Sequence, residues 1–218
     1  MIDRAMIVVG AGSSHRFGTD KLMSPVAGRP LIAHTVAAVI GRVAVCILVC
    51  RADQMSALER LDLGAVLVPG GPTRTSSEMA GLAAIGESAD LIGIHDGARP
   101  LVAAGLIEAL FEAAAQSGGA IPIVEPTIPL IHRTDLTPVE GPVLAQTPQV
   151  FHGEPLVAAY LQAARMEYQG QDTAEIAQKF TGLEIRAIPG DPSNIKVTYP
   201  EDLASVREVL EPSRSGPR

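Results

Sequence analysis

The sequence predicts a single α/β domain built on a doubly wound, mostly parallel, Rossmann-like sheet. Apolar runs typical of buried strands alternate with helical patterns along most of the 218 residues, which is the rhythm of βαβ units. Hydrophobic residues make up 47% of the chain but aromatic residues only 3%, so the core must be aliphatic, as in most parallel sheets. The first apolar run, residues 5–9, leads directly into a glycine-rich turn, and such sheets bind ligands beyond the carboxyl ends of their strands.

Each expected element follows from a local pattern. The strands are short runs dominated by Val, Ile, Leu and Ala, at residues 5–9, 43–50, 65–68, 91–95, 119–124 and 183–188. The helices have apolar residues at helical spacing between these runs, at residues 30–40, 54–61, 75–85, 104–115, 154–165, 173–180 and 201–210. Pro30 stands in the first turn of the first helix, where proline is well tolerated.

The alternation breaks in residues 125–149, which contain five prolines, too many for a central strand or helix. The segment is too long for an ordinary connection and contains apolar residues that a monomer would expose, such as Ile128 and Leu136. We expect a protruding arm that joins two copies into a homodimer, with a long surface loop as the alternative. Residues 1–210 then form one domain, and residues 211–218 a disordered tail.

Composition excludes several classes of protein. The net charge of −7 argues against a nucleic-acid-binding surface, which is normally basic. The N-terminus lacks a signal-peptide pattern and no apolar run is long enough to span a bilayer, so no membrane partner and a cytoplasmic location are expected. Cys46 and Cys50 lie too far apart along an expected strand for a disulfide and are expected to be buried thiols.

The glycine-rich turn at residues 9–18 points to nucleotide chemistry. Small residues let its backbone approach an anion closely, and Arg16 and Lys21 place two cations in the same loop. Such a turn suits the holding of a polyphosphate while one phosphoryl bond is exchanged. The dinucleotide fingerprint fails at His15, and the Walker loop fails because Thr19 and Asp20 follow Gly18. A flexible turn with incidental charges remains the alternative from this loop alone.

Four further polar sets follow other strands or turns: Pro69–Ser77, His95–Pro100, Gln146–Gln149 and Asn194–Thr198. The first has glycines that permit close approach to a base or ribose, hydroxyls that can cap the next helix, and Arg74, which a cap does not require. In the second, Asp96 is well placed for magnesium, and Arg99 either pairs with Asp96 or reaches a phosphate. A purely structural ion pair is the alternative.

These motifs, in this order, resemble the 2-C-methyl-D-erythritol 4-phosphate cytidylyltransferase family from about residue 5 to residue 210. The resemblance implies a CTP site, made of Gly10, Ala11, Gly12, Ser13, Gly70, Gly71, Arg74, Ser77, Asp96, Gly97 and Ala98. It implies that Arg16, Lys21 and Lys196 are catalytic. Arg16 and Lys21 match residues that stabilise the transition state and the leaving pyrophosphate, Lys196 matches a residue around the phosphates, and Asp96 matches one near a magnesium ion.

The resemblance also implies acceptor-binding roles, for Arg99, Thr127, Arg133, Thr147 and Asp172. Here the sequence departs from the family in two places. The arm begins Pro126-Thr-Ile-Pro129, where the family usually has Asp-Thr followed by an apolar residue and Lys. The arginine that the family usually carries on the returning half of the arm is absent, and Arg133 is the nearby arginine. We therefore expect methylerythritol phosphate as the acceptor, with another polyol phosphate such as ribitol 5-phosphate, or a phosphonate, as the alternative. A non-catalytic nucleotide-binding module and a nicotinamide-dependent oxidoreductase are the competing classes.

Overall fold

The structure is a computed structural model, and it describes residues 3–12, 17–86 and 89–211. Of the expected tail, all but Glu211 lies outside the described residues. Within the described part, none of the helices is long and apolar enough to cross a bilayer.

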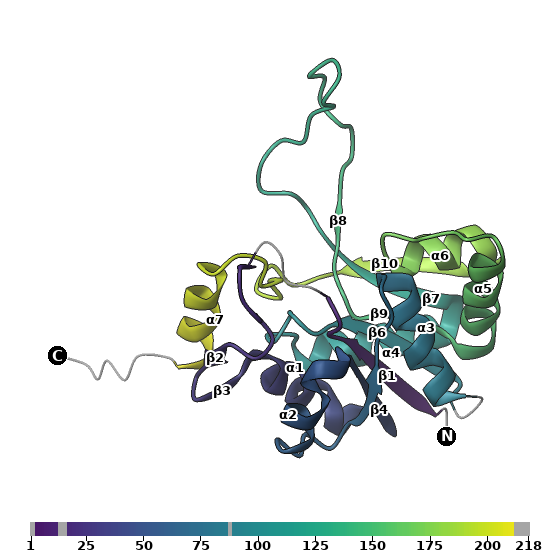
Figure 1. Cartoon of the computed structure of the whole chain (residues 1–218). Coiled ribbons are helices and arrows are strands. Elements are labelled where there is room, and N and C mark those ends of the chain that lie inside the picture. The colour runs from purple at the N-terminus through teal and green to yellow at the C-terminus, as the bar shows by residue number, and fades with distance from the viewer. Residues whose placement is uncertain (1–2, 13–16, 87–88, 212–218) are drawn as a thin grey trace.

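An eight-stranded sheet forms the centre of the molecule (Figure 1). Its order is β10-β7-β9-β6-β1-β4-β5, with β8 paired to β7. The strands span β1 Arg4–Val9, β4 Val45–Cys50, β5 Val66–Pro69, β6 Leu91–Asp96, β7 Gly118–Val124, β8 Leu144–Ala145, β9 Gln149–His152 and β10 Glu184–Pro189. Central β1 is parallel to both neighbours, and its Ile7 faces Ile47 of β4 and Ile94 of β6. The expected mostly parallel α/β sheet is confirmed.

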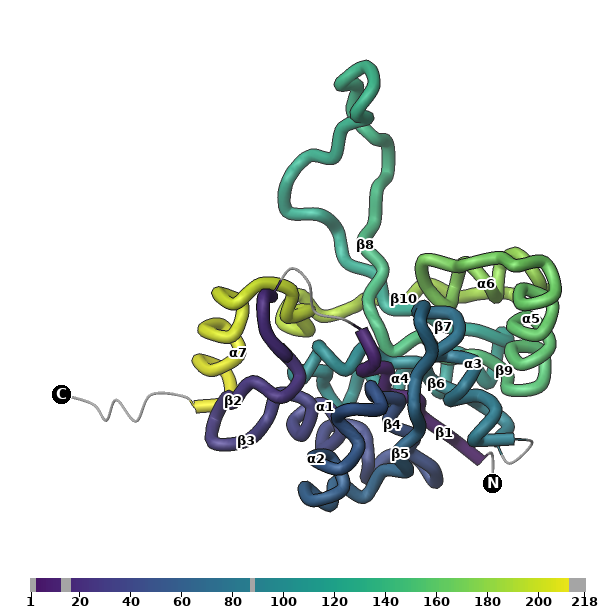
Figure 2. Tube along the Cα trace, viewed as in Figure 1, coloured from purple at the N-terminus to yellow at the C-terminus, as the bar shows by residue number. Residues whose placement is uncertain are grey.

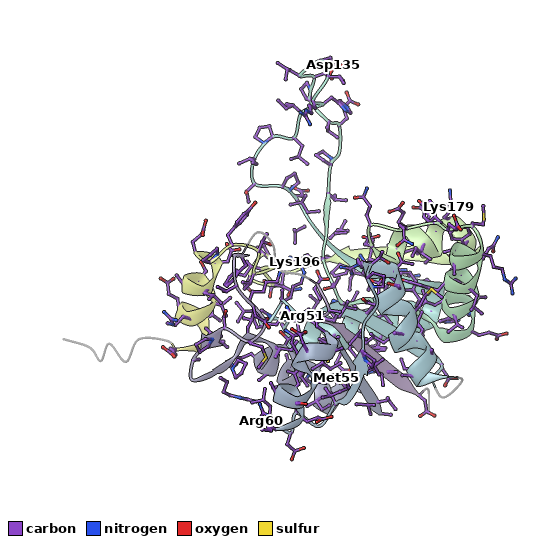
Figure 3. All side chains as sticks on the ribbon, viewed as in Figure 1. Arg51, Met55, Arg60, Asp135, Lys179 and Lys196 are labelled. Carbon is purple, nitrogen blue, oxygen red and sulfur yellow. The ribbon has the colours of Figure 1, made fainter. Side chains whose placement is uncertain are left out.

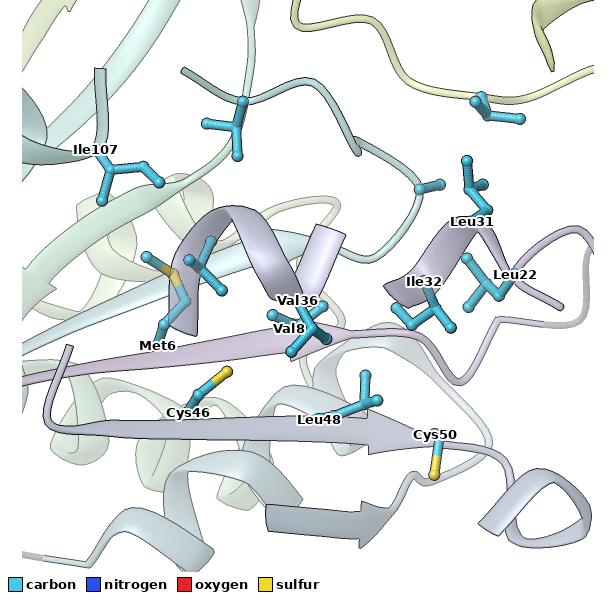
Figure 4. Packing of buried hydrophobic residues seen from close by; sticks show 14 of the residues in the cluster. Met6, Val8, Leu22, Leu31, Ile32, Val36, Cys46, Leu48, Cys50 and Ile107 are labelled. Carbon is cyan, nitrogen blue, oxygen red and sulfur yellow. The ribbon is translucent and has the colours of Figure 1, made fainter. Parts of the chain in front are cut away.

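Helices cover both faces of the sheet, as a doubly wound fold requires. The side chains of Met6 and Val8 in β1 pack on one face with α1, α2, α4 and α7, whereas Ala5 and Ile7 pack on the other with α3, α5 and α6 (Figure 4 shows the first face). The helices are α1 Leu31–Val39, α2 Met55–Glu59, α3 Arg74–Ile85, α4 Ala104–Ser117, α5 Gly153–Arg165, α6 Thr173–Phe180 and α7 Asp202–Leu210. This alternation along β1 follows from the two-residue period of a strand.

The arrangement of strands differs in places from the sequence-based expectation, which also gave no strand at β8. β9 begins at Gln149, inside the segment expected to hold no central strand, and lies antiparallel between β6 and β7. Pro148 directly precedes Gln149, the first residue of β9, so the prolines of this segment lie before the strand and do not interrupt its hydrogen bonds. A small hairpin of β2 Pro25–Val26 and β3 Arg29–Pro30 was also not expected. Its turn places Ala27 and Gly28 at positive φ, 46° and 74°.

The expected arm is present. After β7 the chain leaves the body, turns near Asp135 and returns through β8 into β9 (Figures 1 and 2; Asp135 is labelled in Figure 3). An isolated bridge between Ile131 and Pro138 closes its tip. The side chains of Ile128 and Leu136 are 69% and 68% exposed, so the arm presents large apolar side chains to solvent.

Candidate active site

A cavity of about 540 Å³ lies beyond the carboxyl ends of β1, β4, β5 and β6, within the size range of small-molecule sites. Each of these strands ends in residues that line it: Gly10–Gly12, Arg51–Ala52, Gly70–Arg74 and Asp96–Ala98. Ser77 of α3, Lys21, Leu22 and Lys196 complete the wall. The cavity therefore gathers every described residue of the expected CTP site, together with Lys21 and Lys196. Ser13 and Arg16 lie outside the described residues.

Glycine is required where the strand ends meet in the cavity floor. A Cβ on Gly70 would lie 2.3 Å from the Cβ of Ala11, and one on Gly97 would lie 3.0 Å from the carbonyl oxygen of Val9. The amides of Gly70 and Gly97 donate to Cys50 (2.8 Å) and Val9 (2.9 Å), which extends the sheet ladder past the strand ends. These two glycines shape the floor, and their N–H groups are already used.

Asp96 is the centre of a cluster of cations. Its Oδ1 accepts from Arg74 Nη1 at 2.8 Å, and its Oδ2 lies 2.8 Å from Lys196 Nζ and 3.5 Å from Arg99 Nε. Burial alone would raise the pKa of Asp96, but the charges of Arg74 and Lys196 outweigh it and hold that pKa well below its usual range. Asp96 is therefore a fixed negative charge at the cavity wall.

Arg99 does not line the cavity. Its side chain is 11% exposed, its Nη1 donates to the carbonyl oxygen of Asn194 at 2.6 Å, and burial lowers its pKa. Of the alternatives for Arg99, this geometry supports pairing with Asp96. A direct role in holding the acceptor would require the side chain to leave these partners, and that role stays a prediction.

His95 and Thr147 form a directed hydrogen-bond chain behind Asp96. The carbonyl oxygen of Arg99 can only accept, so His95 Nε2, 3.1 Å away, carries the proton. Nδ1 is then the acceptor for the Thr147 hydroxyl at 3.0 Å, and the Thr147 oxygen accepts the amide of Asp96 at 3.0 Å. Thr147, expected in the acceptor pocket, is buried and its hydroxyl is used to fix the backbone of Asp96. The sequence-based prediction gave no role to His95.

Lys21 is held by the backbone at Val197, and its neighbour Asp20 is held by residues that follow β4. Lys21 Nζ donates to the carbonyl oxygen of Val197 at 3.1 Å. The neighbouring Asp20 accepts from Gln54 Nε2 at 2.6 Å and pairs with Arg51 at 3.6 Å. Arg51 lines the cavity but was not among the expected site residues, although a cation directly after a buried strand was a visible signal. Arg51 and Lys196 are labelled below the foot of the arm in Figure 3.

The remaining expected residues lie apart from this cavity. Thr127 and Arg133 are exposed on the arm. Asp172 is the N-cap of α6: its Oδ1 accepts from the amide of Glu175 at 2.9 Å, and its Oδ2 accepts from Gln149 Nε2 at 3.0 Å. Helix α3 begins at Arg74, one residue before its expected start at residue 75, and is capped by Thr73, one of the hydroxyl residues of the Pro69–Ser77 set. Asp172 thus has a structural partner set, and its role toward an acceptor stays a prediction.

Comparison with known proteins identifies relatives over the whole domain. The family model described as IspD, 2-C-methyl-D-erythritol 4-phosphate cytidylyltransferase, matches residues 4–212. A protein of that name from Synechococcus sp. (strain CC9902) is 34% identical, with 97% of this chain and 99% of the relative covered. Another from Cereibacter sphaeroides (strain KD131 / KCTC 12085) is 38% identical, with 94% and 96% covered.

Solved structures agree with these sequence relatives. The 2-C-methyl-D-erythritol 4-phosphate cytidylyltransferase of Thermus thermophilus superposes with a TM-score of 0.80 at 29% identity, covering 96% of this chain and 98% of that one. The 4-diphosphocytidyl-2C-methyl-D-erythritol synthase of Anaerococcus prevotii gives 0.82 at 25% identity, with the same shares covered.

Proposed function

The chain belongs to the 2-C-methyl-D-erythritol 4-phosphate cytidylyltransferase family, and we propose that its cavity transfers CMP from CTP to 2-C-methyl-D-erythritol 4-phosphate. A phosphate oxygen of the acceptor attacks the α-phosphorus of CTP, the bond from that phosphorus to the bridging oxygen breaks, and pyrophosphate leaves. This is a step of isoprenoid precursor synthesis by the non-mevalonate route. The observation that carries the proposal is the convergence of glycine turns, cations and Asp96 on one cavity.

The chemistry assigns roles to the cations. The transition state of nucleotidyl transfer carries concentrated negative charge, and fixed cations stabilise it without reorganisation. Lys21 lines the cavity and is held by the backbone at Val197, so its ammonium is preorganised there. Lys196 is 2.8 Å from Asp96 and can exchange that partner for a phosphate oxygen. We assign Lys21 and Arg16 to the reacting phosphates and Lys196 to the triphosphate.

Asp96 fits the role of a magnesium ligand. It stays ionised, and its Oδ1 contacts one cation only, Arg74, so that oxygen retains a lone pair for a metal ion. Among the described residues no cluster of three or more His, Cys, Asp or Glu gathers to hold a metal, so the protein would supply Asp96 and the substrate its phosphate oxygens. Mg²⁺ is commonly bound in this way. When bound, the ion would neutralise charge on the phosphates.

We propose that the enzyme is a homodimer joined by the arm in residues 125–149. The arm exposes apolar side chains and carries Thr127 and Arg133 away from the cavity of its own chain. In such a dimer both residues would lie near the acceptor in the partner's cavity, and Arg133 would supply a cation for the acceptor's phosphate. A second copy would also bury Ile128 and Leu136.

Subunit mixing tests this arrangement. An Arg133→Ala protein mixed with an Arg16→Ala protein should regain activity, because each mixed dimer would contain one site with both arginines. A monomer at assay concentration would refute the dimer. A dimer that gains nothing on mixing would show that the acceptor's phosphate is held from within one chain.

A pyrophosphate-release assay tests the reaction itself. With CTP and magnesium, methylerythritol phosphate should support turnover well above that with ribitol 5-phosphate or a phosphonate acceptor. Protein that binds CTP in calorimetry but does not turn over methylerythritol phosphate would contradict the assigned acceptor. No turnover with any acceptor would leave the binding-module class as the explanation.

We also propose that the enzyme works in the cytoplasm. Cys46 and Cys50 are buried free thiols, and burial raises the pKa of Cys46 to about 12, so it is protonated and inert. Free thiols are usual in reducing compartments. Recovery of the protein in a secreted or membrane fraction of its native host would contradict this location.

A further inference from the structure

A buried carboxylate lies behind the cavity wall and has no part in the reaction described above. Glu78 of α3 is 0% exposed. Its Oε1 is 2.8 Å from Arg74 Nε and 3.4 Å from the Thr173 hydroxyl, and its Oε2 accepts from the Tyr160 hydroxyl at 2.7 Å. These partners come from α3, α5 and α6, so three helices meet at this carboxylate.

The position is costly for the fold. Removing a carboxylate from water is strongly unfavourable unless it is paired and hydrogen-bonded, and well-packed apolar residues often serve such places at least as well. Burial raises the pKa of Glu78, while Arg74 and the Tyr160 hydroxyl act in the opposite direction. Packing of α3 against α5 therefore does not explain why an acid occupies this position.

The arrangement of Arg74 supplies an explanation. Arg74 is the first residue of α3, one turn before Glu78, and its guanidinium lies between two buried carboxylates. Nε faces Glu78 while Nη1 donates to Asp96 at 2.8 Å. The ion pair with Glu78 and the hydrogen bond to Asp96 hold the guanidinium between the two carboxylates. The same side chain lines the cavity.

Charge leads to the same conclusion. Asp96 faces three cations, Arg74, Arg99 and Lys196. Without a second carboxylate, Arg74 would be free to follow the phosphates of a bound nucleotide and leave Asp96. Glu78 gives Arg74 a partner that no ligand can reach, because Glu78 is enclosed by Tyr160 and Thr173.

We propose that Glu78 is a positioning residue for nucleotidyl transfer: with Tyr160 and Thr173 it locks the guanidinium of Arg74, and through it the carboxylate of Asp96, in the geometry of the loaded site. Glu78 itself touches no reacting atom. The inference rests on the proposed function for its kinetic consequences, whereas the locked guanidinium is a property of the protein alone.

Glu78→Gln tests the lock because it keeps the size of the side chain and removes its charge. We expect kcat to fall by roughly tenfold or more, as for small misplacements of catalytic groups. CTP affinity measured by calorimetry should stay within about twofold or become tighter, because a negative charge near the site is lost. Tyr160→Phe removes one hydrogen bond to Glu78 and should give a smaller loss in the same direction. Tyr168→Phe is the matched control, since its hydroxyl donates to Glu175 outside the cavity and its loss should leave kcat unchanged.

A double-mutant cycle shows whether Glu78 acts through Arg74. In an Arg74→Ala background, Glu78→Gln should cause no further fall in kcat and should raise the melting temperature, since it removes an uncompensated buried charge. Additive losses in kcat would overturn the proposal, as would a folded Glu78→Gln protein with kcat within about twofold of the parent. If Glu78→Gln does not fold, an unchanged kcat in Tyr160→Phe would overturn it.

A readout without substrate separates this inference from the proposed function. In the parent protein the Nε–H signal of Arg74 in a nitrogen-15 NMR spectrum should be protected from exchange with solvent, and it should lose that protection in Glu78→Gln. A protected signal with no turnover of any acceptor would refute the function and leave the lock in place. An unprotected Arg74 signal in an active parent enzyme would refute the lock.

Discussion

Acidification should destabilise this protein through His95, by an amount that can be worked out from the structure. The imidazole is fully buried, and burial lowers its pKa from 6.5 to about 4. The unfolded chain therefore binds more protons than the folded one between about pH 6.5 and about pH 4, so stability falls as the pH falls through this window. At 1.36 kcal/mol per pKa unit, the full loss is about 3 kcal/mol, most of it present by about pH 4.5.

Urea denaturation of the parent protein and of His95→Gln, at a series of pH values, measures the loss of folding stability caused by His95. Glutamine can donate to the carbonyl of Arg99 and accept from the Thr147 hydroxyl, as the neutral ring does, but it has no proton to gain. Between about pH 7.5 and about pH 4.5, the parent should lose about 2.5 kcal/mol more than the variant. Equal losses would refute the reasoning, because they would show that His95 protonates in the folded state without cost. Carboxylates such as Asp96 titrate in both proteins and cancel in the comparison.

Three further changes address the cavity directly. Lys21→Ala should lower kcat on the order of a hundredfold or more while CTP affinity in calorimetry changes far less, because its cation acts mainly on the transition state; equal losses in both would indicate uniform binding. Asp96→Asn should raise the magnesium concentration needed for half-maximal rate, and an unchanged requirement would show that Asp96 orients its neighbours without holding the ion. Gly70→Ala should weaken CTP binding, because the added Cβ would lie 2.3 Å from that of Ala11 and force two cavity loops apart. Gly105→Ala, where the added Cβ meets nothing within 4 Å, is its control, and similar CTP affinities for the two variants would count against a crowded floor.

The parts of the site that the sequence predicted are those that depend on strand ends. A buried parallel strand is recognisable as an aliphatic run, and the topology brings the carboxyl ends of neighbouring runs together. The Gly10, Gly70 and Asp96 segments therefore had to meet near β1. Arg51 obeys the same rule, since it follows Cys50 at the end of β4, and it was missed because no motif surrounds it.

The direction of polar side chains could not be predicted in this way. Arg99 and Thr147 belong to motifs near the cavity, yet both point into the protein and hold backbone. The residue types that bind a ligand are also those that satisfy buried carbonyl and amide groups, so sequence alone does not separate the two uses. Asp172 is a similar case, because an aspartate before a helix is a common N-cap.

The burial of Glu78 could not be predicted from local sequence patterns. In the helix expected at residues 75–85, an acid among small residues is typical of a solvated face. The helices that bury it, α5 and α6, come much later in the chain, and the Tyr160 hydroxyl that completes its shell is 82 positions away in sequence. Antiparallel β9 depends on equally distant contacts, with Phe151 facing Ile92 of β6 and Gly119 of β7. The burial of Glu78 and the position of β9 both depend on tertiary contacts, so only the folded structure reveals them.

The distribution of charge explains how an acidic protein can bind a triphosphate. The chain carries a net charge of −7, which disfavours long polyanions such as nucleic acids that would lie across much of its surface. Within the cavity, however, Lys21, Arg51, Arg74 and Lys196 outnumber Asp96. A cavity of about 540 Å³ suits one nucleotide, so attraction acts at short range on a ligand that fits and is weak outside the opening. Two of these cations are directed by buried carboxylates, because Asp96 pairs with Arg74 and Lys196, and Glu78 pairs with Arg74.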